Sequence, residues 1–245
     1  MNITLFNLKK GILIFLLSFC ISAVIAGGLP FFLGRTNSIF TLAAILFFAV
    51  PLMYLPVIRK KCLQKALLSF SDEDCRIERP KGETVIRWDE IATYRARPWK
   101  SMVGTGFIFD ARAKDGHHVK LAVLEKDFMS TAGDIRKDSV LLQLCRHIMD
   151  FNRTKASELD RITLQPGFLL SASGTTLYWI LGVLLIFDLL YRATHPAIGG
   201  KHIGFLFLIL VLAFMVWGQR RTGRLFFEKL SGCQERMAGN QQTTS

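Results

Sequence analysis

The sequence has few cysteines, and none of them belongs to a recognisable metal or redox motif. Its five cysteines are odd in number, widely spaced and include no C-x-x-C pair. Unpaired thiols are typical of a reducing compartment, so no disulfide framework is predicted. The adjacent His117 and His118 would point to opposite faces of a strand, and no cysteine or carboxylate cluster lies beside them in the sequence. The sequence therefore predicts no metal site.

The sequence also lacks the motifs of nucleotide binding and catalysis. The segment Val103–Gly106 contains two glycines, but it has neither the third glycine and strand-to-helix context of a dinucleotide fingerprint nor the lysine of a phosphate-binding loop. We expect it to form a tight turn or bulge before Phe107. No cofactor is predicted, and the protein is not expected to be an enzyme.

Acidic residues are scarce, with 19 Asp and Glu against 31 Lys and Arg and a formal net charge of +12. Much of this excess lies beside apolar runs, where positive charge is explained by membrane topology and by attraction to anionic headgroups. Nucleic-acid binding is therefore not predicted. Asp188 is the single carboxylate within the apolar runs, and its spacing to Arg192 favours an interfacial ion pair over a proton or cation relay.

Apolar residues, by contrast, are abundant and make up 51% of the chain. They are gathered in four blocks, at 11–28, 39–58, 168–190 and 203–218. A helix needs about 20 apolar residues to cross the hydrocarbon core of a bilayer. The sequence therefore predicts four transmembrane helices, arranged as two hairpins at 1–65 and 168–218 that flank a middle domain.

Small residues and prolines within these blocks indicate how the helices pack. Ser18, Ser22 and Ala26 recur at every fourth position, a spacing that lets membrane helices approach closely. Pro51 and Pro56 should kink the second helix. The sequence predicts neither the oligomeric state nor whether the two hairpins pack as one bundle.

The distribution of basic residues predicts the orientation, because Lys and Arg collect on the cytoplasmic side of membrane helices. The candidate juxtamembrane anchors are Arg59, Lys60, Lys61, Arg220, Arg221 and Arg224. We expect both termini and the middle domain to be cytoplasmic, in the inner membrane of a bacterium. One alternative concerns the first block, since Val24–Gly27 resembles a signal-peptidase site.

The middle domain is predicted at 66–152, where apolar and polar residues begin to alternate as in half-buried strands. About six short strands joined by turns are expected there. An amphipathic helix should follow, with Asp134 or Asp138 as its N-cap. Its buried face is predicted to contain Leu141, Leu144, Cys145, Ile148 and Phe151. We expect a linker at 153–167 and, beyond the last apolar block, a basic tail at 219–245 that becomes disordered.

The run Val85–Ile91 places Trp, an acidic pair and Ile after an apolar strand end, and it resembles bacterial pleckstrin-homology-like domains. The order of strands and helix is similar as well, and the similarity covers residues 39–152 at most. Such domains often follow a pair of helices in small bacterial membrane proteins. The resemblance implies an α+β membrane protein with a pleckstrin-like antiparallel β domain and a C-terminal helix. The second hairpin departs from the simplest members, and no active-site residue is implied.

Three cations surround an aromatic residue and a proline at 95–100, where a strand is expected to end. Arg95, Arg97 and Lys100 could hold phosphate headgroups while Trp99 lies in the membrane interface. The resemblance bears on this segment, because pleckstrin-like domains bind lipids and peptides. These four residues form the candidate contact site for membrane lipids or a protein partner.

These features predict a non-enzymatic multipass membrane protein whose β domain is a membrane-anchored binding module. Its ligand would be a protein partner or anionic lipid headgroups. Two alternatives remain open. One is a membrane immunity protein that binds a membrane-acting toxin. The other is a small transporter or channel, which would need polar residues at mid-bilayer, where the apolar blocks show chiefly hydroxyls.

Overall fold

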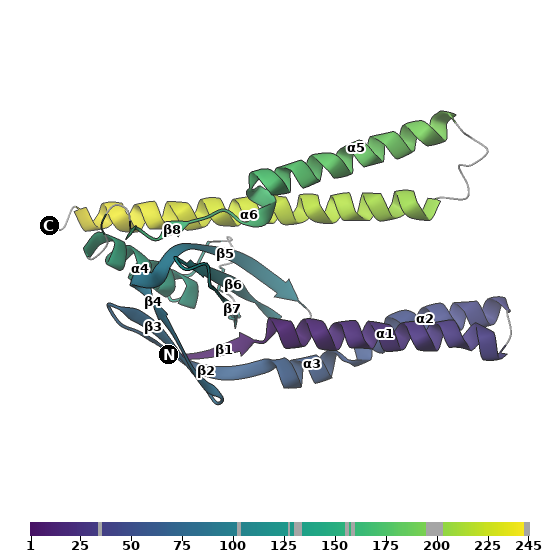
Figure 1. Cartoon of the computed structure of the whole chain (residues 1–245), viewed down its shortest axis with the longest axis horizontal. Helices are drawn as coiled ribbons and strands as arrows, with labels where there is room; N and C mark the ends of the chain where they lie inside the picture. The colour runs from purple at the N-terminus through teal and green to yellow at the C-terminus, as the bar shows by residue number, and fades with distance from the viewer. Residues whose placement is uncertain are drawn as a thin grey trace.

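A computed structural model describes residues 1–33, 36–101, 104–126, 128–129, 134–154, 157, 160–194 and 203–242. The helices are α1 (Leu8–Leu33), α2 (Asn37–Met53), α3 (Leu55–Cys62), α4 (Val140–Thr154), α5 (Ala172–Thr194) and α6 (Ile203–Gln242), with short 3-10 turns η1 (Trp88–Glu90) and η3 (Phe168–Leu170). The strands are β1 (Asn2–Phe6), β2 (Leu63–Phe70), β3 (Asp74–Arg79), β4 (Gly82–Arg87), β5 (Ile91–Ser101), β6 (Gly104–Ala113), β7 (His118–Leu124) and β8 (Thr163–Leu164). The fold is α+β, as predicted. Figure 1 shows two helical hairpins leaving one β domain in the same direction.

The strands form one sheet in the order β4-β3-β2-β1-β7-β6-β5-β8. All neighbours are antiparallel except β5 and β8, which pair in parallel. The first strand lies in the middle, paired on one side with β2 and on the other with β7. Because β1 and β2 are neighbours in the sheet but are separated by α1–α3 in the sequence, the first hairpin is an insertion between two paired strands.

The β domain therefore begins far ahead of the predicted boundary at residue 66. In β1, Ile3 and Leu5 are buried in the core while Asn2 and Thr4 face outward, which is the alternation of a half-buried strand. The backbone N–H of Asn7 donates to the carbonyl of Cys62 at 2.9 Å, directly beyond the β1–β2 ladder. The first hairpin is thus joined to the sheet through two adjacent hydrogen-bonded strands.

The predicted linker at 153–167 is also tied to the domain. Its β8 strand pairs with β5, and Ile162 is buried in the core. The side chain of Asn152 donates to the carbonyl of Ile162 and accepts its backbone N–H, both at 2.8 Å. The chain between α4 and α5 thereby extends the sheet by one short parallel strand.

The core lies between the curved sheet and α4. The five residues predicted for the buried face of α4 are all buried, so this prediction is confirmed. The predicted N-caps are wrong, because the hydroxyl of Ser139 accepts the N–H of Leu142 at 3.2 Å and the carboxylate of Glu125 accepts that of Val140 at 3.2 Å. Asp138 instead pairs with Arg136 at 2.7 Å. A strand-end carboxylate reaching the helix from 15 residues away leaves no local sequence signal.

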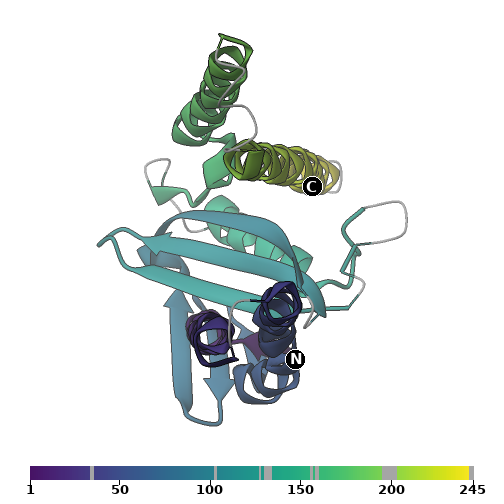
Figure 2. The same cartoon turned by 90° about the vertical axis from the view of Figure 1, so that its right-hand side faces the viewer.

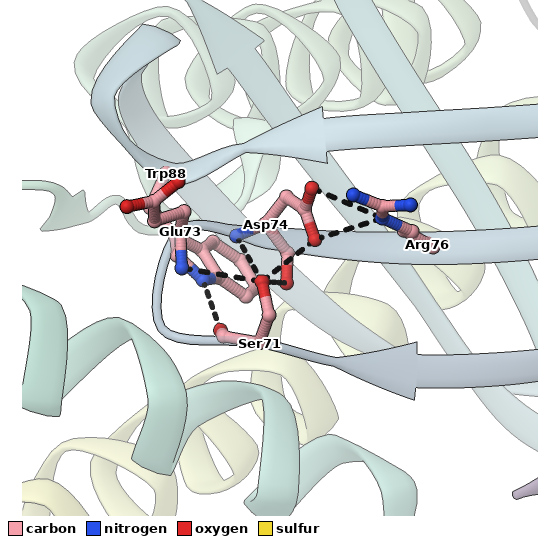
Figure 3. Close-up of polar contacts among 5 residues, drawn as sticks. All are labelled: Ser71, Glu73, Asp74, Arg76 and Trp88. Carbon is pink, nitrogen blue, oxygen red and sulfur yellow. Dashed lines mark hydrogen bonds and ion pairs between the residues drawn. The ribbon is translucent and has the colours of Figure 1, made fainter.

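Trp88, in the run that carries the family resemblance, is a core residue with 1% exposure. Figure 3 shows it held by the β2–β3 turn: its indole N–H donates to the carbonyl of Ser71 at 3.1 Å, and its backbone N–H to that of Glu73 at 2.9 Å. The Ser71 hydroxyl donates to Asp74 at 2.7 Å, and Arg76 donates to the same carboxylate at 3.1 Å. The run Val85–Ile91 thus contributes to packing and turn geometry.

The first hairpin packs as its small residues predicted. Ser18 and Ser22 are fully buried, and the Ser22 hydroxyl donates to the carbonyl of Phe47 in α2 at 3.1 Å. The predicted kink is also present, because α2 ends at Met53 just after Pro51 and α3 begins with Pro56 in its first turn. Close packing of α1 on α2 is therefore built on buried hydroxyls and small side chains.

The second hairpin differs from the prediction at its C-terminal end. Residues 219–242, expected to be a basic tail that becomes disordered, form the second half of the 40-residue helix α6. Phe226 and Leu230 on this half are buried in the domain core. At about 1.5 Å per residue the helix is roughly 60 Å long, about twice the thickness of a hydrocarbon core. One helix therefore pairs with α5 and then continues along the β domain (Figure 1).

Three segments, Leu8–Pro30, Thr41–Cys62 and Ala172–Tyr191, are long and apolar enough to cross a membrane. They agree with the first three predicted spans. The fourth, 203–218, forms the first part of α6, where the side chains of 203–208 lie outside the described part of the chain. The same holds for Arg192, the predicted partner of Asp188. In both Figure 1 and Figure 2 the two hairpins stand apart.

Candidate functional site

The four predicted contact residues lie at the end of β5, but they do not share one face. Side chains alternate along a strand, so Arg95, Arg97 and Trp99 point to one face and Lys100 to the other. The opposite face holds the buried Tyr94. We call the face with Arg95, Arg97 and Trp99 the outer face of β5–β7. The cross-strand register adds Gly106, Ile108, Asp110 and Arg112 of β6 and His118, Lys120, Ala122 and Leu124 of β7 to it.

Trp99 contacts the junction between the sheet and the first apolar helix. Its ring lies against the ring of Phe6, the last residue of β1, with centroids 4.9 Å apart. On α1, a Cβ added to Gly11 would come within 2.6 Å of the Phe6 ring, so the glycine leaves room for it. The contact with Phe6 thus places Trp99 beside the start of α1, where Lys9 and Lys10 follow Phe6 by three and four residues.

Two glycines opposite Trp99 shape the start of β6. Gly106 pairs with Trp99, and a Cβ at this position would collide with the backbone carbonyl of Val123 on β7. Gly104 has a φ of +158°, and a Cβ there would lie 2.5 Å from the Leu124 side chain. The expectation that these glycines serve backbone geometry agrees with both positions; Val103 lies outside the described residues.

Arg95 is part of a charge cluster, in which its Nε is already paired. Its Nε donates to Asp110 at 3.1 Å, and Asp110 also lies 3.5 Å from His118 and 3.9 Å from Lys120. The Asp110 side chain is only 12% exposed. Arg97 and Lys100 are exposed, and within the described ranges no ion-pair partner is found for either. The end of β5 beside α1 therefore offers two exposed cations around Trp99.

Three of the predicted juxtamembrane anchors lie beside the same junction. Arg59, Lys60 and Lys61 form the exposed last turn of α3, which leads directly into Cys62 and β2. The hydrogen bond between Asn7 and Cys62 holds this turn next to the start of α1. Cations from α3 and from β5 thus flank the base of one hairpin.

The other three anchors interact within the second hairpin. Arg220 donates to the Thr175 hydroxyl at 3.0 Å and lies 5.6 Å from the centroid of the Tyr178 ring. Arg221 lies over Trp217 and Arg224 pairs with Glu228 at 2.9 Å. These side chains therefore join α5 to α6 or stabilise α6, and Arg220 is only partly accessible.

Sequence reasoning missed a buried polar contact between α6 and the sheet. The side-chain amide of Gln234 donates to the Tyr94 hydroxyl, which lies 3.8 Å from the Cys145 sulfur. Burial raises the pKa of Tyr94 above its ordinary value and that of Cys145 to about 12, so both stay protonated at neutral pH. This cluster fixes α6 on the core, and only the spacing of Phe226, Leu230 and Cys233 could have indicated it.

His117 and His118 do not converge: His117 lies in the turn beside Asp115, and His118 faces Asp110. Among the residues that the structure describes, no group of three His, Cys, Asp or Glu side chains could hold a metal ion. Comparison with protein-family models gives no match, and no curated protein matches the sequence.

Proposed function

We propose that this protein is a membrane-anchored binding module whose β domain contacts anionic lipid headgroups through the end of β5. Arg97 and Lys100 would pair with headgroup phosphates while Trp99 lies in the interface. The cations of the last turn of α3 would add to the same contact. The observation that carries the proposal is the packing of Trp99 on Phe6, because it places these residues at the base of an apolar helix.

The connectivity supports four membrane spans. Both ends of the first hairpin continue into paired strands of the sheet, and α5 follows β8 of the same sheet. The far half of α6 is buried against the core, so the chain returns to the domain after α5. If α5 crosses the bilayer, 203–218 must cross back. The basic flanks favour the cytoplasm for the domain and both termini, in a bacterial inner membrane.

The sheet order supports a pleckstrin-like domain as part of this proposal. The meander β2–β4 and the meander β5–β7 are joined through β1, and α4 packs on the inner face. The resemblance suggests a module that binds a lipid or a peptide and performs no chemistry. The location of the free cations favours the lipid.

The chemistry of the site suits a lipid surface. Tryptophan is enriched at membrane interfaces, where its ring is apolar and its N–H can meet polar groups. Each Lys or Arg close to an anionic membrane surface contributes about 1 kcal/mol of attraction. Two such residues on β5 and three on α3 would hold the domain against the headgroups, most strongly at low ionic strength because salt screens exposed charges.

Native mass spectrometry of the full chain, ejected from nanodiscs containing phosphatidylglycerol and phosphatidylcholine, tests the proposal. We expect phosphatidylglycerol to be retained preferentially, and retention to fall severalfold when Arg97 and Lys100 are both replaced by Ala. The control replaces Lys81 and Arg87, two exposed cations of the β3–β4 hairpin, of which Arg87 lies 3.7 Å from Glu90. Equal retention by both double variants would refute the proposal. A stoichiometric protein partner released by Arg97→Ala/Lys100→Ala would point to protein binding instead.

A further inference from the structure

The outer face of β5–β7 carries a second group of cations, farther along the strands from Trp99. Arg95 lies on β5, Arg112 on β6 and Lys120 on β7, with His118 beside them. The register aligns Arg95, Asp110 and Lys120 in one row across the three strands, and places Arg112 opposite His118 in the next row. Neighbouring strands are about 4.8 Å apart and alternate residues about 7 Å, so these side chains can reach one ligand.

The charge on this face is strongly unbalanced. Arg95, Arg97, Arg112 and Lys120 are opposed by a single carboxylate, Asp110, among the twelve outer-face positions that the register defines between Thr93 and Leu124. Arg112 is exposed, and within the described part of the chain it has no ion-pair partner. A sheet face of this composition holds a local excess of positive potential.

Asp110 orients the cluster as well as neutralising part of it. It accepts the Nε of Arg95 at 3.1 Å, and this contact leaves the two terminal guanidinium nitrogens free to donate elsewhere. Lys120 is more loosely held, at 3.9 Å, and its side chain is 57% exposed. A guanidinium fixed at one edge loses less conformational entropy when it binds an anion with the other.

The face is also turned toward the helices. At its Trp99 end it packs on Phe6 at the base of α1. Figure 2, which looks along the helices toward the domain, shows β5–β7 crossing the view between the two hairpins. The hairpins stand apart there, so lipid headgroups between them would meet this face.

We propose that Arg95, Arg112 and Lys120 form a binding site for the terminal phosphate of a lipid phosphomonoester, with Asp110 as the competing anion. A phosphomonoester carries up to two charges and three acceptor oxygens, which suits donors that arrive from three strands. This proposal rests on the proposed function in one respect: the β domain must face the membrane. Its residues are distinct from Arg97 and Lys100.

Substitutions that remove a cation and one that removes the carboxylate should have opposite effects on binding if this face is a ligand site, and no effect if it is only solvated. Replacing Arg112 or Lys120 by Ala removes a cation and should weaken binding about fivefold each, the equivalent of one charge near an anionic surface. Replacing Asp110 by Asn removes the competing anion, leaves the side-chain shape unchanged and should strengthen binding by a similar factor. A purely structural role for Asp110 would give no gain.

The experiment uses the full chain in nanodiscs of phosphatidylcholine with 10% or so of either phosphatidic acid or phosphatidylglycerol, a monoester and a diester. Native mass spectrometry counts the lipids retained by wild type, Arg112→Ala, Lys120→Ala, Asp110→Asn and the control Lys81→Ala. We expect preferential retention of phosphatidic acid, lowered by the first two variants, raised by Asp110→Asn and unaffected by Lys81→Ala.

Two results would overturn the proposal. One is retention of phosphatidic acid that is equal in all variants whose thermal unfolding matches wild type. The other is binding of inorganic phosphate without retention of phosphatidic acid. Phosphate binding to the protein in nanodiscs of phosphatidylcholine alone is measured by phosphorus NMR, as broadening of the inorganic phosphate resonance. If Arg97→Ala/Lys100→Ala loses retention of phosphatidylglycerol but still retains phosphatidic acid, this result supports the phosphomonoester site. It also shows that this site is distinct from the lipid contact at the end of β5.

Discussion

At the scale of single residues, the candidate site depends on glycines as much as on cations. Gly106, opposite Trp99, lets β6 approach the backbone of Val123 on β7 closely, and Phe6, which Trp99 contacts, fits against α1 because Gly11 has no side chain. Sequence patterns predicted Arg97, Trp99 and Lys100 as contact residues, since cations beside an aromatic residue at a strand end are visible in the sequence; Arg97 and Lys100 are exposed and Trp99 is half-buried. The contact partners could not be foreseen, because they come from residues about 90 positions away.

Gly106→Ala should destabilise the domain by about 3 kcal/mol, because the new methyl group would collide with the carbonyl of Val123 and force the β6–β7 backbone apart. Thermal unfolding in detergent, followed by circular dichroism, measures the change. Gly167→Ala is the control, since a Cβ there meets nothing within 4 Å and its φ is −61°. Equal unfolding temperatures for the two variants would contradict the close approach at Gly106.

Asp74 should make the stability of the domain sensitive to acid. The hydrogen bond from Ser71, and then that from Arg76, lower the pKa of Asp74 below its ordinary value. A carboxylate with a lowered folded-state pKa contributes stability above its unfolded pKa, near 3.9, and loses that contribution as the pH falls through the folded value. Asp74→Asn should therefore be less stable than wild type at neutral pH.

The stability difference between wild type and Asp74→Asn should shrink as the pH is lowered below about 4. Denaturant titrations between pH 3 and pH 7 measure it. Asp89→Asn, at an exposed position in η1, is the control and should leave the pH profile unchanged. A constant difference across the range would show that Asp74 acts through packing alone.

At the scale of elements, the six strands of the middle domain and the amphipathic α4 were predictable, because their periodicity is local. Strand β1 was not, since five residues in front of a long apolar run give too little alternation to separate strand from helix. The C-terminal half of α6 was missed for a different reason. Its composition is polar, and it is helical because Phe226 and Leu230 dock on the core and Gln234 meets Tyr94.

The central place of β1 argues against signal-peptide cleavage after the first span, because cleavage would remove a strand paired on both sides. Leu5→Ala should destabilise the domain by about 3 kcal/mol, since Leu5 is 5% exposed and its loss leaves a cavity beneath β1. The neighbouring Thr4→Ala, on the outward face, should change stability by less than about 1 kcal/mol. Chemical denaturation of the two variants in detergent gives the comparison. Similar values for both would mean that β1 is not part of the folded core.

At the scale of the whole molecule, one sheet connects both hairpins. The first enters through the β1–β2 ladder, and the second enters through β8 and returns through α6. The sequence predicted the two hairpins and the domain between them from composition alone. It could not predict that they are mechanically joined, because the joining contacts pair residues far apart in the chain, such as Gln234 with Tyr94, which are 140 positions apart. Motion of either hairpin should therefore be transmitted through the sheet.

With the proposed four membrane spans, this connectivity determines which parts of the chain share a side of the membrane. Single cysteines at Lys81, in the β3–β4 turn, and at Thr36, between α1 and α2, should be labelled from opposite sides by a membrane-impermeant maleimide. Cys20 and Cys233 are first replaced by Ala, since Cys62, Cys75 and Cys145 are buried. We expect Lys81→Cys to react in inside-out vesicles and Thr36→Cys in right-side-out vesicles. Reaction of both from one side would mean that α1 and α2 do not cross the bilayer as a hairpin, and the headgroup contact at Trp99 would then lose its geometric basis.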